Sequence, residues 1–173
     1  IAVLLPHGVL FRGNAEETIR KYIVKDLNYL DAVIGLPANC FQGTSIPVCC
    51  LILKRERNGN SNNICFIDAS KYYTQGKAQN SISQDDIDRI VNAYTERKDI
   101  DKFCHIATME EIEENDYNLN IPRYVDTFEP EPEVDLQEVA NDIRKVQAEI
   151  KDIDKELKPF FDELGLDFPF GET

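Results

Sequence analysis

The sequence lacks the features that mark several common protein classes. No apolar run approaches the ~20 residues that cross a bilayer, and the opening stretch IAVLLP is too short for a secretory signal. Only two histidines occur, His7 and His105, and they stand too far apart to share a zinc ion. The five cysteines are odd in number, include the adjacent pair Cys49 and Cys50, and form no CxxC motif. We therefore expect a cytoplasmic protein with reduced cysteines, no metal ion and no membrane contact.

Signatures of catalytic sites are absent as well. The sequence contains no GxGxxG, no Walker loop, no GxSxG and no HExxH motif. Two isolated histidines support neither a Cys–His nor a Ser–His–Asp grouping. The carboxylates lie mostly in charge-rich segments, which is typical of a solvated helix face. The residues alone therefore assign no catalytic group to this chain.

Basic residues are few, but the deficit is local. The chain has 32 acidic and 19 basic residues, for a net charge of −13, which argues against a protein that coats nucleic acid. Residues 1–98 hold 12 basic and 10 acidic residues, a net charge of +2, whereas residues 99–173 hold 7 and 22, a net charge of −15. The charge argument therefore applies to residues 99–173 and leaves residues 1–98 open to DNA contact.

Short apolar runs alternate with amphipathic stretches, which predicts an α/β fold. We expect strands over residues 1–6, 30–36, 47–55, 64–70 and 103–107. The first and third of these have apolar residues on both faces, a pattern typical of strands that are covered on both sides, so we expect both to be central in the sheet and not at an edge. Helices are expected after Asn14, Ser83 and Thr108, each of which can act as an N-cap. The first helix should bury a face made of Ile19, Tyr22, Ile23 and Leu27.

The end of the chain has a different organisation. Residues 128–135, FEPEPEVD, read as a stiff, acidic, proline-containing linker. The residues after it predict a heptad helix over 136–164, with Pro159 ending or kinking it near Lys158. Its apolar stripe consists of Leu136, Val139, Ile143, Val146, Ile150, Ile153, Leu157, Phe160 and Leu164. A narrow stripe after a linker favours a partner helix, and folding back onto the chain's own domain is the alternative.

Four blocks of sequence resemble a known family. In order they are LLPHGVLFRGNAEETIRKYIV, LDAVIGLPANCFQGTSIPVCCLILKR, ICFIDASKYY and EENDYNLNIPRYVDT. They are similar to consecutive blocks of the modification (methyltransferase) subunit of type I restriction–modification systems, which are adenine-specific DNA methyltransferases that use S-adenosylmethionine. The resemblance implies that residues 1–127 are the C-terminal part of a Rossmann-like methyltransferase domain, followed by a long C-terminal α-helix.

The resemblance also implies what the chain does without. The family's glycine-containing cofactor loop and its Asn-Pro-Pro-aromatic catalytic motif lie upstream of the first block, and neither occurs in these 173 residues. We therefore expect a C-terminal fragment of a longer subunit that binds no S-adenosylmethionine and is inactive alone. The family's usual assembly implies a DNA-specificity subunit, a second modification subunit and double-stranded DNA as partners. The heptad helix would dock on the specificity subunit, and the fragment alone is expected to self-associate.

Three groups of residues are candidates for contacts in such an assembly. The resemblance suggests that Phe41, in a loop with Gly43 and Thr44, packs on the extruded target base, and ordinary core packing is the alternative. A second group, Lys54, Arg55 and Arg57, follows a strand and can meet phosphate, with a solvated strand end as the alternative. A third group, Asn118, Asn120 and Arg123, is expected to order the irregular segment by backbone hydrogen bonds.

Two other functions stay open at this point. The chain can be a non-enzymatic interaction module whose acidic tail and heptad helix are the functional parts. It can also be a small nucleotide-binding α/β protein, because α/β sheets place ligands at the carboxyl ends of their strands.

Overall fold

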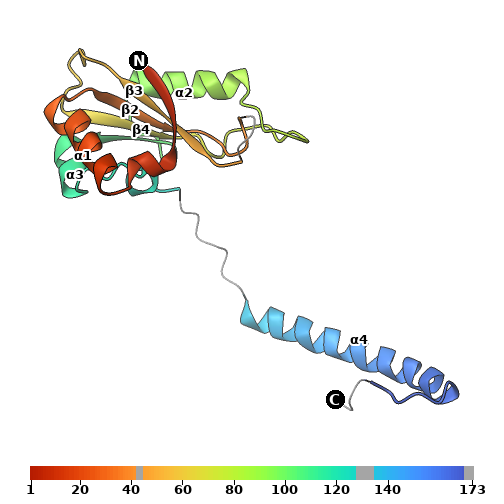
Figure 1. Cartoon of the computed structure of the whole chain (residues 1–173). Helices are drawn as coiled ribbons and strands as arrows, with labels where there is room; N and C mark the ends of the chain where they lie inside the picture. The colour runs from red at the N-terminus through yellow and green to blue at the C-terminus, as the bar shows by residue number, and fades with distance from the viewer. Residues whose placement is uncertain (42–44, 128–134, 170–173) are drawn as a thin grey trace. The chain divides into compact units, whose positions relative to one another are not determined.

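The chain divides into two compact units, Ile1–Phe128 and Glu129–Thr173, which are described separately. A computed structural model describes residues 1–41, 45–127 and 135–169 (Figure 1). The first unit is a mixed α/β structure with a five-stranded sheet of order β1-β3-β2-β4-β5. Its strands are β1 (Ala2–Pro6), β2 (Leu30–Gly35), β3 (Val48–Leu53), β4 (Asn63–Asp68) and β5 (Cys104–Thr108).

The strands do not all run in one direction. β3 is antiparallel to both β1 and β2, β2 is parallel to β4, and β5 is antiparallel to β4. β1, β2 and β4 therefore point the same way, and their carboxyl ends meet at one edge of the sheet.

Helices cover both faces of the sheet, with α1 and α3 on one face and α2 on the other (Figure 1). Their bounds are η1 (His7–Leu10), α1 (Ala15–Lys21), η2 (Tyr22–Asp26), α2 (Gln84–Glu96), α3 (Met109–Glu114) and η3 (Ile121–Arg123). Ser83 caps α2 in a reciprocal box with Asp86, and Thr108 caps α3 by accepting from the Glu111 amide. Asn14 precedes α1 with a φ of 59°, outside the extended conformation usual for an N-cap, and makes no side-chain cap.

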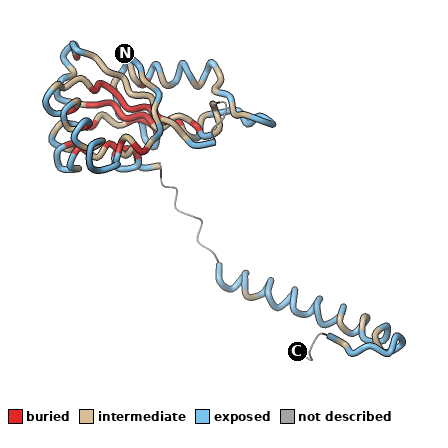
Figure 2. The backbone as a smooth tube through the Cα atoms, in the orientation of Figure 1, coloured by how far each residue is buried: buried red, intermediate tan, exposed pale blue. Residues whose placement is uncertain are grey.

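The core lies on the two faces of the central strands, where the buried residues gather (Figure 2). Toward α1 and α3 it includes Leu10, Val24, Val33, Phe66, Ile112 and Tyr124, and the Phe66 and Tyr124 rings stack with centroids 3.9 Å apart. Toward α2 it includes Ala32, Ile34, Cys65, Ile67, Phe103 and Cys104. All five cysteines are free thiols.

The expectation that the first strand is covered on both sides was wrong. Within the described residues β1 pairs only with β3, so it lies at an edge, and Leu4 is 51% exposed. The expectation for the third strand was right, because β3 lies between β1 and β2. Composition identifies an apolar strand but does not say which strands become its neighbours.

The predicted apolar face of the first helix was right only in part. Ile23 packs against the core and Leu27 is half-buried, but Ile19 and Tyr22 are more than half exposed. The buried side chains are those of Arg20 and Val24. Arg20 turns inward because its guanidinium meets backbone carbonyl groups. The chain then continues from α1 into the π-helical turn η2, which shifts the buried face by the extra residue in each turn.

The second unit contains the helix α4 (Leu136–Glu163). Asp135, predicted as the end of the linker, is its N-cap and accepts from the amides of Gln137 and Glu138. The rest of the predicted linker, residues 128–134, lies outside the described residues. The helix does not end near Lys158, since α4 continues through Pro159, and a kink at this position stays a prediction.

The last turn of α4 packs against the residues that follow the helix. The Phe161 and Phe168 rings meet edge to face with centroids 5.4 Å apart, and Gly165 adopts a left-handed φ of 67° that turns the chain back. Of the described residues of α4, none is buried. No helix in the described ranges is long and apolar enough to cross a membrane.

Candidate functional site

The carboxyl ends of β1, β2 and β4 bring Pro6, Gly35 and Asp68 to one edge of the sheet. The ends of β2 and β4 are joined, because the amide of Ala69 donates to the carbonyl oxygen of Gly35 over 2.9 Å. The Asp68 carboxylate accepts from the amide of Ser70 over 2.9 Å and closes the turn after β4. Sheets of this kind place their ligands at such an edge, so we take it as the candidate site.

A segment distant in sequence reaches the same edge. A Cβ atom added to Gly35 would lie 2.7 Å from Cδ1 of Ile121, so η3 packs directly on the end of β2. One turn earlier, the amide of Leu119 donates to the carbonyl oxygen of Leu10 in η1. The first and last of the four sequence blocks therefore meet at the candidate site.

Arg20 holds these two blocks together. Its Nε donates to the carbonyl oxygen of Tyr117 over 2.8 Å, and its Nη1 donates to those of Val9 and Arg12 over 3.0 Å each. Burial lowers the pKa of Arg20, and the nearby carboxylates of Glu17 and others act in the opposite direction. The sequence analysis missed Arg20, because its spacing places it off the apolar face of its helix.

The segment that Arg20 holds has a strained turn. Asp116 and Tyr117 both have positive φ angles, 53° and 57°, which are costly for residues other than glycine. Asn118 orders the chain after this turn as predicted, since its side chain accepts from the amide of Asn120 over 3.0 Å. Arg123 instead donates to the side chain of Asn115 over 3.1 Å, so its contact is not with the backbone.

Phe41 lies in the loop after β2, which we call the Phe41 loop (residues 36–41). It is half-buried and borders an open hollow of about 540 Å³ lined by Cys40, Phe41, Gln79, Asn80, Ser81 and Ile82. Phe41 is therefore at the carboxyl edge and not in the sheet core. The other two predicted members of this group, Gly43 and Thr44, lie outside the described residues.

The predicted basic group lies at the opposite end of the sheet. β3 runs antiparallel to β2, so Lys54, Arg55 and Arg57 follow β3 at the amino end of β2, near Asp31. One strand length, about 20 Å for six residues, separates the two edges. The structure therefore does not bring Phe41 and the basic group together.

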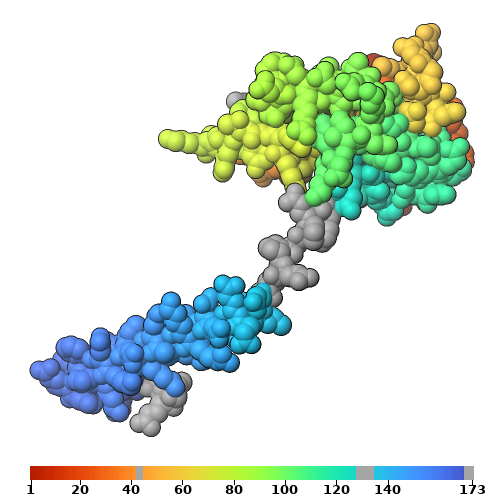
Figure 3. All heavy atoms as spheres, turned by 180° about the vertical axis from the view of Figure 1, so that it is seen from behind, coloured from red at the N-terminus to blue at the C-terminus, as the bar shows by residue number. Residues whose placement is uncertain are grey.

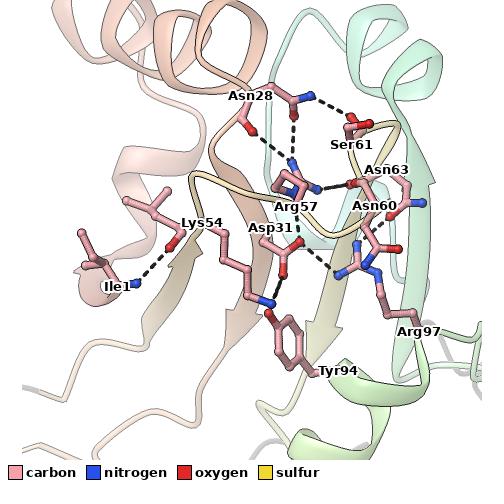
Figure 4. Close-up of polar contacts among 11 residues, drawn as sticks. Ile1, Asn28, Asp31, Lys54, Arg57, Asn60, Ser61, Asn63, Tyr94 and Arg97 are labelled. Atoms are coloured by element: carbon pink, nitrogen blue, oxygen red, sulfur yellow. Dashed lines mark hydrogen bonds and ion pairs between the residues drawn. The ribbon is translucent and has the colours of Figure 1, made fainter.

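Asp31 is the centre of a buried ionic cluster (Figure 4). Its Oδ1 lies 2.9 Å from Nε of Arg57 and 3.3 Å from Nη1 of Arg97, and its Oδ2 lies 3.2 Å from Nζ of Lys54. The hydroxyl of Tyr94 also donates to Oδ2. Burial raises the pKa of this carboxyl group, but the Tyr94 hydrogen bond and the three cations outweigh burial and lower it.

Arg57 uses all of its donors within the chain. Besides Asp31, it donates from Nη1 to the side chain and carbonyl oxygens of Asn28, and from Nη2 to the carbonyl oxygens of Asn60 and Asn63. A guanidinium has five N–H groups, and five bonds account for them. Arg55 differs, since it is exposed and its Nε reaches the hydroxyl of Tyr29 over 3.5 Å.

The part of the chain around these two edges matches a known family. The model of the N-6 DNA methylase family matches residues 1–133. The chain belongs to this family. Among residues 1–41, 45–127 and 135–169, no group of three or more His, Cys, Asp or Glu side chains is placed to hold a metal ion.

Relatives within the N-6 DNA methylase family are type I methylase subunits. The chain is 38% identical over 169 residues to the type I restriction enzyme MjaVIII methylase subunit of Methanocaldococcus jannaschii, covering 94% of this chain and 28% of the relative. It is 33% identical over 167 residues to the MpnII methylase subunit of Mycoplasma pneumoniae, covering 96% of this chain and 30% of the relative. The chain thus spans less than a third of these relatives' length.

Solved structures of type I methyltransferase subunits are similar to this chain as well. The type I restriction–modification methyltransferase subunit of Streptococcus thermophilus superposes with a TM-score of 0.69 at 59% identity, over 73% of this chain and 26% of that one. The M protein of the type I enzyme EcoKI superposes with a TM-score of 0.55 at 18% identity, over 98% of this chain and 44% of that one, and shares the fold.

The stripe predicted for partner docking is exposed on α4. Six of its members, Val139, Ile143, Val146, Ile150, Ile153 and Phe160, are 41–62% exposed. Exposed side chains of this kind on a charged helix are available to a partner. Docking of α4 on a partner subunit stays a prediction.

Proposed function

We propose that the chain is the C-terminal part of the modification subunit of a type I restriction–modification system. The whole subunit would transfer a methyl group from S-adenosylmethionine to adenine at a specific DNA site. The observation that carries the proposal is the meeting of the second and last family blocks at the carboxyl edge, at Gly35 and Ile121, with Phe41 in the adjoining loop. The family match over residues 1–133 supports the same activity.

The sheet order supports a Rossmann-like parent domain. β3 lies antiparallel between β1 and β2, whereas β2 and β4 are parallel, and a mixed sheet of this kind is compatible with the end of a Rossmann-like sheet. Within the described residues the outer edge of β1 has no strand partner, so further strands of the parent domain would pair there.

The groove beside α1 does not fit S-adenosylmethionine. Its volume is about 270 Å³, it is lined almost entirely by aliphatic side chains, and Arg20 in its wall already donates to three carbonyl groups. Such a groove offers little to the hydroxyl, amino and carboxylate groups of the cofactor. We assign cofactor binding and the methyl-transfer step to the rest of the parent subunit.

Phe41 is proposed to hold the target base. The amino group of adenine is inaccessible in a stacked duplex, so the base must leave the helix before methylation. An aromatic ring at the carboxyl edge can pack on such a base, and base–aromatic stacking contributes about 1–3 kcal/mol. Half-burial leaves part of the Phe41 ring accessible for this contact.

Contacts with DNA phosphates are proposed only for two of the three basic residues. Arg57 has no donor left, whereas Lys54 and Arg55 are partly or fully exposed. Phosphate contacts by Lys54 and Arg55 would occur at the amino end of β2 and would serve to position the duplex.

The remaining proposals concern the assembly. α4 docks through its stripe on a DNA-specificity subunit, together with a second modification subunit, in the cytoplasm. The acidic residues 99–173 favour a protein partner over DNA, because they would repel phosphates.

The proposal is tested with the full-length subunit and its specificity subunit. Labelled S-adenosylmethionine and a duplex with the target adenine should give label in DNA, and a duplex in which that adenine is methylated on both strands should not. The 173-residue chain, without the rest of the parent subunit but with the specificity subunit, should give no label in DNA. Methylation by the chain alone would show that it contains the cofactor site, and no methylation by the assembled parent would contradict the proposal.

A second function is favoured by the exposed stripe of α4 alone. In that case the chain is an interaction module without enzymatic activity. Pull-down by the full-length subunit with and without residues 133–173 separates the two functions. If the deletion prevents capture of the specificity subunit, but methyl transfer persists when the two subunits are tethered, the assembly proposed here is favoured. A parent that binds partners but never methylates DNA would favour the module.

A further inference from the structure

A second loop is built against the Phe41 loop. It comprises residues 74–81, between β4 and α2, and projects from the first unit as the yellow-green segment in Figures 1 and 3. Its ends form an antiparallel bridge, with the Thr74 amide donating to Ser81 over 2.8 Å and the Ser81 amide donating to Thr74 over 3.0 Å. We call it loop 74–81.

Two neighbouring residues of this loop bind three successive carbonyl groups of the Phe41 loop. The side chain of Asn80 donates to Ala38 over 2.9 Å, and its backbone amide donates to Asn39 over 2.8 Å. The side-chain amide of Gln79 donates to Cys40, the residue directly before Phe41. This ladder fixes the backbone that carries the Phe41 ring.

The held segment contains a conformation that needs such support. Asn39 has a left-handed φ of 56°, which turns the chain two residues before Phe41. Its side chain donates back to the carbonyl of Ala78 over 3.4 Å, so the two loops are bonded in both directions. Conformations of this kind persist where surrounding contacts determine them, and they gather at functional sites.

Loop 74–81 is itself anchored at both ends. Before it, the Tyr72 ring meets Phe103 edge to face with centroids 4.9 Å apart. After it, Ser83 caps α2. Within it, a Cβ atom on Gly76 would lie 2.1 Å from the carbonyl oxygen of Gln79, so the turn closes tightly behind the residue that donates to Cys40. Loop 74–81 is therefore a fixed support that can hold Phe41 in position.

We infer that Gln79 and Asn80 are positioning residues that hold Phe41 in place for the target base. The inference rests on the proposed role of Phe41 in adenine methylation and extends it to a loop to which no role has been assigned. Neither residue needs to touch DNA, because each acts through the backbone at Ala38–Cys40. Small displacements of groups that orient a substrate cost up to about 100-fold in rate, which sets the scale of the expected effect.

The test uses the full-length subunit assembled with its specificity subunit. Asn80→Ala should lower kcat about 10- to 100-fold and leave KM for DNA within about threefold, because positioning and not DNA binding is lost. With 2-aminopurine in place of the target adenine, the fluorescence rise that accompanies base extrusion should fall in parallel. Gln75→Ala removes an exposed side-chain amide from the same loop and serves as the matched control, with unchanged values.

A second background separates positioning from general loss of structure. In Phe41→Ala, the further change Asn80→Ala should have no additional effect on kcat, since Asn80 acts through Phe41. Equal losses in both backgrounds would overturn the inference, and so would a full kcat for Asn80→Ala in the wild-type background. If Asn80→Ala does not fold, as judged by thermal melting, Gln79→Ala is measured in its place with the same expectations. No effect of Phe41→Ala on its own would instead contradict the proposed role of Phe41.

Discussion

The carboxylate of Asp31 and the guanidinium of Arg57 form a buried pair, with Oδ1 and Nε 2.9 Å apart. Asp31 lies at the amino end of β2, and Arg57 lies in the turn between β3 and β4. Arg97 and Tyr94, from the end of α2, complete the cluster. One carboxylate thus joins two strands, a turn and a helix, at the edge of the sheet opposite Phe41.

Replacing this carboxylate should destabilise the first unit strongly. Asp31→Asn leaves Arg57, Arg97 and Lys54 close together without a counter-charge. Breaking a buried pair in this way costs about 3–5 kcal/mol, because the remaining charges stay desolvated. Urea unfolding followed by circular dichroism gives the difference in free energy of unfolding. Asp26→Asn makes the same change at an exposed position and should cost less than about 0.5 kcal/mol. Similar losses for the two variants would contradict this role of Asp31.

The contribution of Asp31 should also depend on pH. Its pKa is lowered in the folded chain, so its stabilisation is present above the unfolded value of about 3.9 and is lost as pH falls through the folded pKa. The difference in unfolding free energy between wild type and Asp31→Asn should therefore be constant above about pH 5 and shrink below about pH 4. A constant difference down to the lowest measurable pH would show that the carboxyl group does not titrate in this range.

His105 should contribute stability with the opposite pH dependence. Its Nδ1 lies 3.0 Å from Asp99 and its Nε2 lies 2.9 Å from Glu111. Burial lowers the pKa of His105, but the carboxylates of Glu111 and Asp99 outweigh burial and raise it. Its stabilisation is therefore complete below the unfolded value of about 6.5 and is lost as pH rises through the folded pKa.

The measurement compares wild type with His105→Gln by urea unfolding between about pH 5 and pH 9. The difference in free energy of unfolding between the two proteins should be largest at the acidic end of this range and vanish at the alkaline end. A difference that grows with pH would mean that His105 is held neutral.

The sequence allowed the strands, the caps of α2 and α3 and the family to be predicted, but not the ionic cluster. Continuous apolar runs identified β2, β3 and β4, since buried strands require them. Asp31 stands inside such a run, and a lone acid there indicates a buried partner. Arg57 is that partner, yet it follows a strand in a polar turn and was interpreted as a possible phosphate contact. The Asp31–Arg57 pair forms because β2 and β3 are neighbours in the sheet. The hydrophobic periodicity of a strand does not predict which strand lies beside it.

The candidate site was predicted in part for a similar reason. Ligands were expected at the carboxyl ends of the strands, and the structure brings the ends of β1 and β2 to one edge of the sheet. The support of the Phe41 loop by Asn80 was not expected, because it links residues about 40 positions apart through backbone carbonyls. Backbone acceptors are the same at every residue, so the sequence carries no mark of such a contact.

The contact between Gly35 and Ile121 should be measurable as a coupling. Gly35→Ala places a methyl group 2.7 Å from Cδ1 of Ile121 and should cost about 1–3 kcal/mol of unfolding free energy. Ile121→Val removes that Cδ1 atom, so Gly35→Ala should cost at least about 1 kcal/mol less in this background. Gly13→Ala, where the nearest atom is the Glu17 carboxylate oxygen at 3.7 Å, is the control and should be close to neutral. If Gly35→Ala lowered the free energy of unfolding equally in both backgrounds, its cost would not arise from contact with Ile121.

The stripe of α4 should determine binding to the specificity subunit. Ile150 is 50% exposed at the centre of the stripe, so a carboxylate there would be buried against the partner without a counter-charge. Ile150→Glu should weaken binding at least tenfold, which corresponds to about 1.4 kcal/mol. Ala148→Glu adds the same charge two positions away, off the stripe, and should bind as wild type does. Binding is measured by calorimetry, and thermal melting should show the first unit unchanged in both variants. Equal affinity of the two variants would mean that the stripe does not face the specificity subunit.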